Sequence, residues 1–362
     1  MVYVQHASCL TAFGDAERSC AALCDGKVAL RLTDIPEIEN EEKLPLALVE
    51  PPGSFGEARW MAHLRRLAEA LPDSPWGTER FPIYLTSSNY GIDALFAHSR
   101  DRDVVHLLAA TPHAIAERFR KSFGWGAGIT VLSHACVTAQ LGLVLAERAV
   151  ESGAAEAALV FSFDFLSPFV IGGFSALKIL NGGLPAPYHD GEMGSIGLGE
   201  GAGAVVIGKE PSACKVEKQA LFNEMYHFTA NAPDGSGFAR VLDSCLPEGA
   251  HPKLWVKGHG TGTLEAGALE ARAVEARLPG APLLSWKGSL GHTLGSCAVV
   301  ELAIALEALR SGRAPGNVGG AAPYFTGSIQ GGSFDTAPYE GALLLSNAFG
   351  GAHAAMWIRY DA

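Results

Sequence analysis

Two segments of equal length repeat the same pattern in the two halves of the chain. AQLGLVLAERAVESG (139–153) and AVVELAIALEALRSG (298–312) share helical periodicity and end in the same Ser-Gly pair, which is typical of a helix C-terminus. Each segment follows a strand-like run and a turn with reactive side chains. Each half also contains a glycine-rich, strand-forming segment, at 197–208 and 346–358. The repeat predicts two similar halves that meet near residues 209–220.

The rest of the pattern indicates the fold class. Apolar β-rich runs such as FPIYLTSS and AALVFSF alternate with Ala- and Leu-rich helical stretches such as ARWMAHLRRLAEAL, which predicts a layered α/β architecture. The chain has 362 residues, of which 48% are hydrophobic, so it can bury one large core or two fused ones. We expect an N-terminal half over residues 1–210 and a C-terminal half over 211–362.

Charge and cysteine usage exclude several classes of protein. The formal net charge of -11 disfavours nucleic acid as a partner, because phosphate contacts require clustered Lys and Arg. The start, MVYVQHASCLTAFGD, lacks the pattern of a secretory signal, and no uncharged apolar run is long enough to span a membrane. The seven cysteines form no CxxC pair, so we expect no metal site and a cytoplasmic location.

Four reactive residues lie at junctions between expected elements. Cys136 (VLSHACVTAQ) lies between an apolar strand and a helix, where free backbone N–H groups and the helix dipole stabilise a thiolate. His259 (VKGHGTGTLEAG) and His292 (SWKGSLGHTLGS) each follow a strand-like run, which predicts a shared polar pocket. Lys287, five residues before His292, is placed to orient or polarise that histidine.

This set of side chains favours acyl transfer. A thiolate attacks thioesters, and two neutral imidazoles that donate to one carbonyl oxygen suit a reaction that develops an enolate. A cysteine protease would use one histidine with an orienting Asn or Asp. The glycine series at 197–203 precedes a strand instead of opening a helix, so it does not predict a dinucleotide site.

Four ordered motifs resemble the β-ketoacyl-acyl carrier protein synthases, the elongating condensing enzymes of fatty acid and polyketide synthesis. The motifs are HACVT, HGTGT followed by EARAV, KGSLGH and SNAFGGAH. The resemblance implies a thiolase fold of two pseudo-duplicated αβαβα halves and dimerisation through a strand near GITVLS. The partner would be a second copy, or a related ketosynthase or chain-length factor. It also implies no bound cofactor, because the substrates are carried on the phosphopantetheine of acyl carrier protein.

The resemblance assigns the central roles by matching position. Cys136 would be the acylated nucleophile, while His259 and His292 would promote decarboxylation of malonyl-carrier and hold the resulting enolate. Lys287 would support His292, with Glu270 as the partner of Lys287.

The resemblance also assigns supporting residues. The N–H groups of Cys136 and Phe349 would form the oxyanion hole, and Phe349 would also line the substrate site. Thr261 and Thr263 would bind the pantetheine arm, and Glu301 would be a buried structural carboxylate. Three arginines of the expected helix at 58–71 would dock the acidic carrier protein: Arg59, Arg65 and Arg66.

Some features depart from the family pattern and leave other functions open. SNAFGGAH is two residues shorter than the usual loop, which leaves the gating phenylalanine in question, and FSFDF (161–165) replaces a common Gly-Gly pair with bulk that we expect to reshape the acyl channel. The alternatives are a non-catalytic chain-length-factor-like subunit and a degradative thiolase. The thiolase would need a second cysteine near the C-terminus, and none follows Cys297.

Overall fold

The computed structural model describes residues 1–38, 42–50, 55–247, 249, 252–320 and 322–361. Its largest element is a ten-stranded sheet with the strand order β11-β10-β14-β15-β9-β1-β8-β6-β4-β5. The strands from the first half are β1 (Val2–Leu10), β4 (Ile83–Thr86), β5 (Ile129–Leu132), β6 (Ala157–Asp164) and β8 (Gly201–Gly208). Those from the second half are β9 (Cys214–Asn223), β10 (Leu254–Lys257), β11 (Leu283–Leu284), β14 (Gly341–Ala348) and β15 (Ala352–Tyr360).

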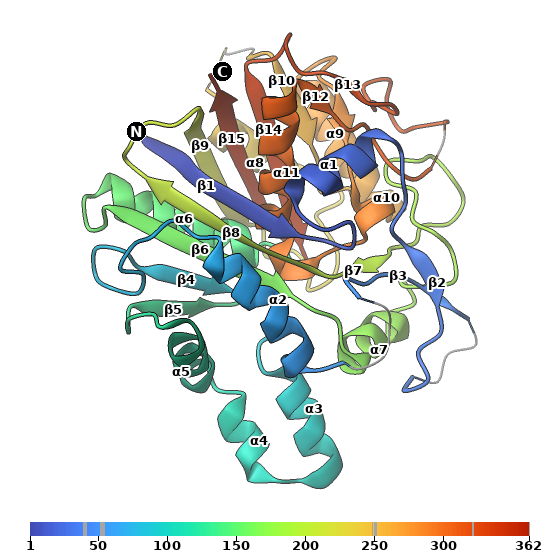
Figure 1. Ribbon diagram of the computed structural model, residues 1–362. Coiled ribbons are helices and arrows are strands. Elements are labelled where there is room, and N and C mark those ends of the chain that lie inside the picture. Colours follow the sequence, from blue (N-terminus) through green and yellow to red (C-terminus); the bar gives the residue numbers. More distant parts are fainter. Residues whose placement is uncertain (39–41, 51–54, 248, 250–251, 321, 362) are drawn as a thin grey trace.

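Helices cover the sheet, and short strands lie in the connections between the larger elements (Figure 1). The helices of the first half are α1 (Ala16–Cys24), α2 (Glu57–Glu69), α3 (Ile92–Asp101), α4 (Val104–Ala109), α5 (Pro112–Phe123), α6 (Thr138–Glu151) and α7 (Pro168–Ala176). Those of the second half are α8 (Ser236–Cys245), α9 (Leu264–Arg277), α10 (Lys287–Leu290) and α11 (Cys297–Ser311), with a 3₁₀ turn at Leu294–Ser296. The short strands are β2 (Arg31–Thr33), β3 (Leu44–Ala47), β7 (Leu198–Gly199), β12 (Arg313–Ala314) and β13 (Phe334–Asp335).

The two halves have the same strand order. In the first half β5, β4 and β6 are parallel, and β8 and β1 add antiparallel strands. In the second half β11, β10 and β14 are parallel, and β15 and β9 add antiparallel strands in the same order. A two-residue pairing, Val2 with Val216 and Tyr3 with Lys215, joins the halves at β1 and β9. The division of the chain at residue 210 stays a prediction, and these matching orders support it.

The repeated segments form matching helices, α6 and α11. The chain leaves α6 through Gly153, with φ of 80°, and α11 through Gly312, with φ of 76°. These left-handed positions suit glycine, because a Cβ atom is strained there. The predicted pair of helices and their Ser-Gly ends are confirmed.

Side chains on the two faces of the sheet pack against helices and form one central core and two outer cores. In β6, Ala158 and Val160 join the core formed by α6 and α11, while Leu159 and Phe161 point the other way into a core with α2 and α5. In β10, Trp255 joins the central core, and its neighbours on both sides in sequence face α8 and α9. Successive side chains of a strand face opposite sides of a sheet, so each half-sheet lies between a shared central helix layer and an outer one. The predicted αβαβα layering is confirmed.

Within the described residues, the structure contains no helix that combines the length and hydropathy of a membrane span.

Candidate active site

Cys136 lies on a tight turn between β5 and α6. Ala135 has a φ of 45°, a left-handed conformation that costs a non-glycine residue on the order of 1–3 kcal/mol. The Thr138 hydroxyl holds the turn, because it donates to the Ala135 carbonyl at 2.6 Å and accepts the His134 N–H at 2.7 Å. The strained turn places Cys136 at the wall of a cavity of about 290 Å³.

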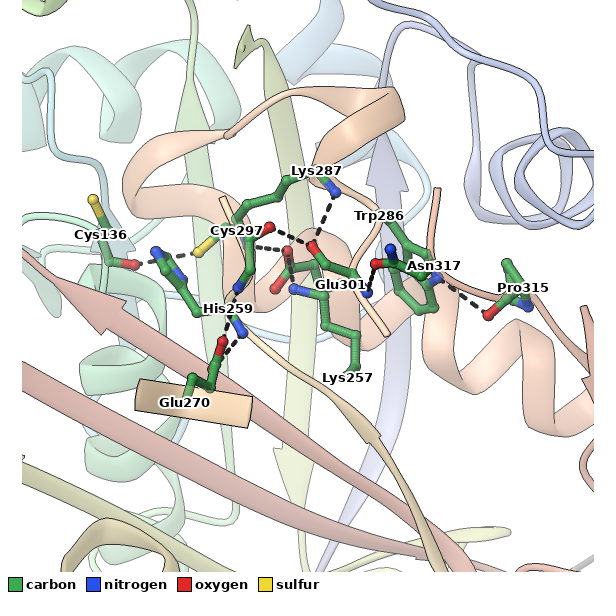
Figure 2. A network of polar contacts seen from close by, with 12 residues as sticks. Cys136, Lys257, His259, Glu270, Trp286, Lys287, Cys297, Glu301, Pro315 and Asn317 are labelled. Carbon is green, nitrogen blue, oxygen red and sulfur yellow. Dashed lines mark hydrogen bonds and ion pairs between the residues drawn. The ribbon is translucent and has the colours of Figure 1, made fainter. Parts of the chain in front are cut away.

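The protonation of Cys136 differs from the expected thiolate. Burial raises the pKa of the Cys136 thiol, and the neighbouring Cys297 raises it further, while Lys287 lowers it by a smaller amount. The Cys297 thiol donates to the Cys136 carbonyl at 3.3 Å, so this second cysteine lies directly behind the nucleophile candidate (Figure 2). The thiol is therefore protonated at neutral pH, and attack on a thioester requires a nearby base.

His259 and His292 reach the same cavity from different loops. Their ring centroids are 5.0 Å apart and their planes are nearly perpendicular, at 88°. Burial, followed by the charge of Lys287, holds the pKa of both imidazoles well below the ordinary range, so both are neutral. Among the described residues, His259 Nδ1 and both ring nitrogens of His292 have no hydrogen-bond partner. The pair can therefore accept a proton or donate to a substrate oxygen in the cavity.

Glu270 holds the loop of His259 and not Lys287. Its carboxylate accepts the backbone N–H groups of His259 at 2.7 Å and Gly260 at 3.0 Å, and the Tyr188 hydroxyl at 2.7 Å. The prediction that Glu270 is the partner of Lys287 is wrong, because these three donors face the carboxylate. Sequence reasoning also missed Tyr188, which lies far from the motifs along the chain.

Lys287 pairs with Glu301. Its Nζ lies 2.5 Å from Glu301 Oε1, and both side chains are buried, which agrees with the predicted burial of Glu301. The structure gives no hydrogen bond from Lys287 to His292 within the described residues, so Lys287 acts on His292 through its charge. A second lysine that sequence reasoning missed, Lys257, also contacts Glu301 Oε1 (Figure 2).

We expect the substitution Glu301→Gln to destabilise the protein strongly. It leaves Lys257 and Lys287 buried without a carboxylate, and breaking a buried ion pair in this way costs about 3–5 kcal/mol. Urea unfolding measures the loss, and Glu307→Gln, whose carboxylate pairs with the exposed Arg310 on the same helix, is the matched control. A loss no larger than that of the control would contradict the shared ion pair.

Three further residues of the predicted site also line the cavity. Thr261 and Thr263 line it, and their hydroxyl oxygens are 3.2 Å apart. Phe349, in the turn between β14 and β15, also lines it and stacks on Phe174 of α7 at 6.4 Å. The oxyanion hole of the Cys136 and Phe349 N–H groups stays a prediction.

Asp164, at the end of β6, is a buried carboxylate that sequence reasoning missed. It accepts the Ser87 hydroxyl at 2.6 Å, the Asn89 N–H at 3.1 Å and the Ser296 N–H at 3.1 Å, and thus ties the loop after β4 to the segment that follows His292. Burial raises the pKa of Asp164 to about 6. In the sequence, the single acidic residue of the apolar run FSFDF indicates such a buried carboxylate.

The phenylalanines of FSFDF do not line the Cys136 cavity. Phe161, Phe163 and Phe165 pack into the outer core with α2 and α5. The expectation that their bulk reshapes an acyl channel stays a prediction, because Phe163 and Phe165 line a separate, smaller pocket beside α2 and α5.

Arg59 is unavailable for docking a partner. Its guanidinium pairs with the buried carboxylate of Glu200, with Nη1 donating to Oε2 at 3.0 Å, and its side chain is only 10% exposed. Arg59 faces the sheet from α2, whereas Arg65 and Arg66 of the same helix are exposed. The expected docking patch therefore loses Arg59.

The structure therefore combines a duplicated αβαβα fold with a cysteine and two neutral histidines at one cavity. Residues 213–320 match the family model of the β-ketoacyl synthase C-terminal domain. A putative polyketide β-ketoacyl synthase 1 of Streptomyces cyaneus is 25% identical over 269 residues, covering 67% of this chain and 63% of the relative. The 3-oxoacyl-[acyl-carrier-protein] synthase 2 of Coxiella burnetii is 28% identical over 273 residues, covering 69% and 63%.

Solved structures share the whole fold. A β-ketoacyl synthase from Burkholderia phymatum has a TM-score of 0.83 at 19% identity, covering 100% of this chain and 99% of that one. A ketosynthase from Xenorhabdus doucetiae, solved in complex with its chain length factor, has a TM-score of 0.77 at 20% identity, covering 99% and 98%. The resemblance to the β-ketoacyl synthases of the thiolase superfamily is confirmed, although the chain spans only 63% of the length of these curated relatives.

Proposed function

We propose that the protein catalyses a decarboxylative condensation of a Cys136-bound acyl chain with malonyl-acyl carrier protein, giving 3-oxoacyl-acyl carrier protein and carbon dioxide. The observation that carries the proposal is the shared cavity, which joins Cys136 to the neutral and unpartnered imidazoles of His259 and His292. The fold and the similarity to β-ketoacyl synthases support it.

Acyl loading uses the thiol as nucleophile. As the Cys136 sulfur attacks the thioester carbonyl of an acyl-carrier, its proton moves to a neutral imidazole nitrogen, because burial disfavours a free thiolate. The N–H groups of Cys136 and Phe349 would stabilise the oxyanion. The carrier thiol then leaves with a proton, and the acyl group stays on Cys136.

Condensation uses the histidine pair. Malonyl-carrier loses carbon dioxide, and the negative charge moves onto the thioester oxygen, where His259 and His292 donate hydrogen bonds to the enolate. The enolate carbon attacks the acyl-cysteine, the carbon–sulfur bond breaks, and the Cys136 sulfur takes up a proton. Thr261 and Thr263, which line the cavity, would position the pantetheine arm.

Acyl transfer to the protein tests the proposal first. We expect incubation with acyl-carriers of graded chain length to add the mass of one acyl group for at least one length, read by intact-mass spectrometry. The chain lengths that load would also show which acyl substrate the protein prefers. This substrate differs between fatty acid, polyketide and polyene pathways. No adduct with any carrier would favour the chain-length-factor-like role instead.

Dimerisation is proposed across β5. This strand lies at one end of the sheet order, so one of its edges has no strand partner among the described residues. The helix α5 contacts β5, and α4, which contacts α5, exposes Val104, Val105 and Leu108. Exposed apolar side chains and an open sheet edge both favour a protein interface. The partner would be a second copy or a related ketosynthase or chain-length factor.

We expect charge reversal at Arg65 and Arg66 to weaken carrier binding. Carrier proteins are acidic and this chain has a net charge of -11, so docking needs a local basic patch. In the double variant Arg65→Glu/Arg66→Glu, KM for acyl-carrier should rise several-fold at low salt, while turnover of a short acyl-pantetheine stays unchanged. Arg18→Glu/Lys27→Glu, in and just after α1, is the control of equal charge. Equal KM values in the two double variants would exclude this docking patch.

A further inference from the structure

Lys257 is a buried cation to which the proposed mechanism gives no role. It is the last residue of β10, two residues before His259, and is 0% exposed. Its ammonium group contacts Glu301 Oε1, the oxygen that Lys287 also contacts at 2.5 Å. Figure 2 shows the two lysines reaching Glu301 from different elements, β10 and α10.

The cluster of Lys257, Lys287 and Glu301 carries more positive than negative charge. Two ammonium groups share one carboxylate, which leaves a net charge of one positive unit when all three are ionised. The other acid near the loop, Glu270, is occupied by the N–H groups of His259 and Gly260 and the Tyr188 hydroxyl. A buried charge without a full partner is costly, and such groups concentrate at functional sites.

The excess charge acts on the histidines. Lys257 and Lys287 both lower the pKa of His259 and of His292, in addition to the larger effect of burial. The charge is thus close enough to act on any group bound between these rings. An incoming anion would be attracted by the same field, since two opposite charges interact strongly in a poorly hydrated interior.

We propose that Lys257 is a positioning residue that makes the buried cluster next to His259 and His292 net positive and thereby favours the anionic malonyl substrate and its enolate over the neutral acyl donor. This inference rests on the proposed condensation. Acyl loading transfers a neutral group, so it gains little from the charge. Decarboxylation begins with a carboxylate and leaves an enolate, so it gains most.

The protonation of Lys257 allows its role to be tested through the pH dependence of decarboxylation. The groups that face Lys257 are Glu301 and Cys297 from α11 and Lys287 from α10, and burial lowers the pKa of Lys257 to about 8. Glu301 raises the pKa of Lys287, so Lys257 loses its proton first. The net charge falls to zero as pH rises through about 8, and decarboxylation should slow over that interval.

Rates of the two half-reactions separate this role from a structural one. In Lys257→Met we expect malonyl-carrier decarboxylation to fall roughly ten-fold at neutral pH, the scale of one nearby charge, while acyl loading of Cys136 changes little. The decline of decarboxylation near pH 8 should also disappear. Lys253→Gln, an exposed lysine just before the same strand, is the control. Equal loss of both half-reactions with an unchanged pH profile would overturn the proposal.

A second readout does not depend on turnover. Imidazole titration by NMR should show higher pKa values for His259 and His292 in Lys257→Met than in the parent protein, because one repelling cation is gone. If the parent protein neither loads acyl groups nor decarboxylates malonyl-carrier, the proposed condensation fails while this titration still tests the charge. Unchanged imidazole pKa values in the folded variant would overturn the role of Lys257.

Discussion

The substitution Cys136→Ala should abolish acyl loading completely. The parent protein should gain the mass of one acyl group from an acyl-carrier, and the variant should gain none. The reason is structural, since the strained turn at Ala135 presents the Cys136 sulfur to the cavity shared with both histidines. The variant should still decarboxylate malonyl-carrier measurably, because that step uses the histidines and needs no thiol.

Cys297→Ala is the matched control for this experiment. Cys297 lies directly behind Cys136 and is buried, so a change that merely disturbs packing there should appear in both variants. We expect Cys297→Ala to retain loading. An acyl adduct on the Cys136→Ala protein would show that another residue is the nucleophile.

Loss of either histidine should stop condensation while sparing the nucleophile. In His259→Ala and His292→Ala we expect condensation to fall about 10²–10³-fold, the usual cost of removing one donor to a developing oxyanion. Some acylation of Cys136 should persist, because the remaining imidazole can still accept the thiol proton. Single-turnover assays with preloaded enzyme measure the condensation step separately from loading.

The control for the histidine variants is His227→Ala, an exposed histidine on the loop after β9. It should leave both steps near the parent rates. Near-normal condensation in His259→Ala or His292→Ala would remove that residue from the mechanism. Loss of loading and condensation together, with normal stability, would instead assign that histidine to activation of the thiol.

The duplicated fold could be predicted from the sequence because its evidence is local. The periodicity of 139–153 and 298–312 identifies α6 and α11, and the Ser-Gly ends mark where they stop. Reactive residues at strand-to-helix junctions converge because equivalent junctions meet at the same edge of each half-sheet. The shared cavity of Cys136, His259 and His292 follows from this pattern.

Pairings between distant side chains could not be predicted in the same way. Glu270 and Glu301 are both acids on helices after a motif, and only the packing shows that Glu301 meets Lys287 while Glu270 meets backbone N–H groups. Arg59 looks like a surface residue in a basic helix, but its periodic position turns it toward Glu200.

The contacts of charged residues in buried strands are also difficult to predict from the sequence. Lys257 ends a short apolar run, and a lysine at the end of a strand is usually exposed to solvent. Its partner, Glu301, lies 44 residues further along the chain, on α11. Asp164 likewise depends on donors from two segments that are distant along the chain. The presence of such residues in apolar strands indicates buried polar contacts, but their partners come from the fold.

Condensation with carbon-labelled malonyl-carrier tests the central claim most directly. The protein would first be loaded with an unlabelled acyl group and then given malonyl-carrier labelled with ¹³C at every malonyl carbon. The account predicts a 3-oxoacyl-carrier that keeps two labelled carbons, release of the third as labelled carbon dioxide, and an unmodified Cys136. Labelled acetyl-carrier as the only product, with the acyl group still on Cys136, or no change in either carrier, would contradict a decarboxylative condensation.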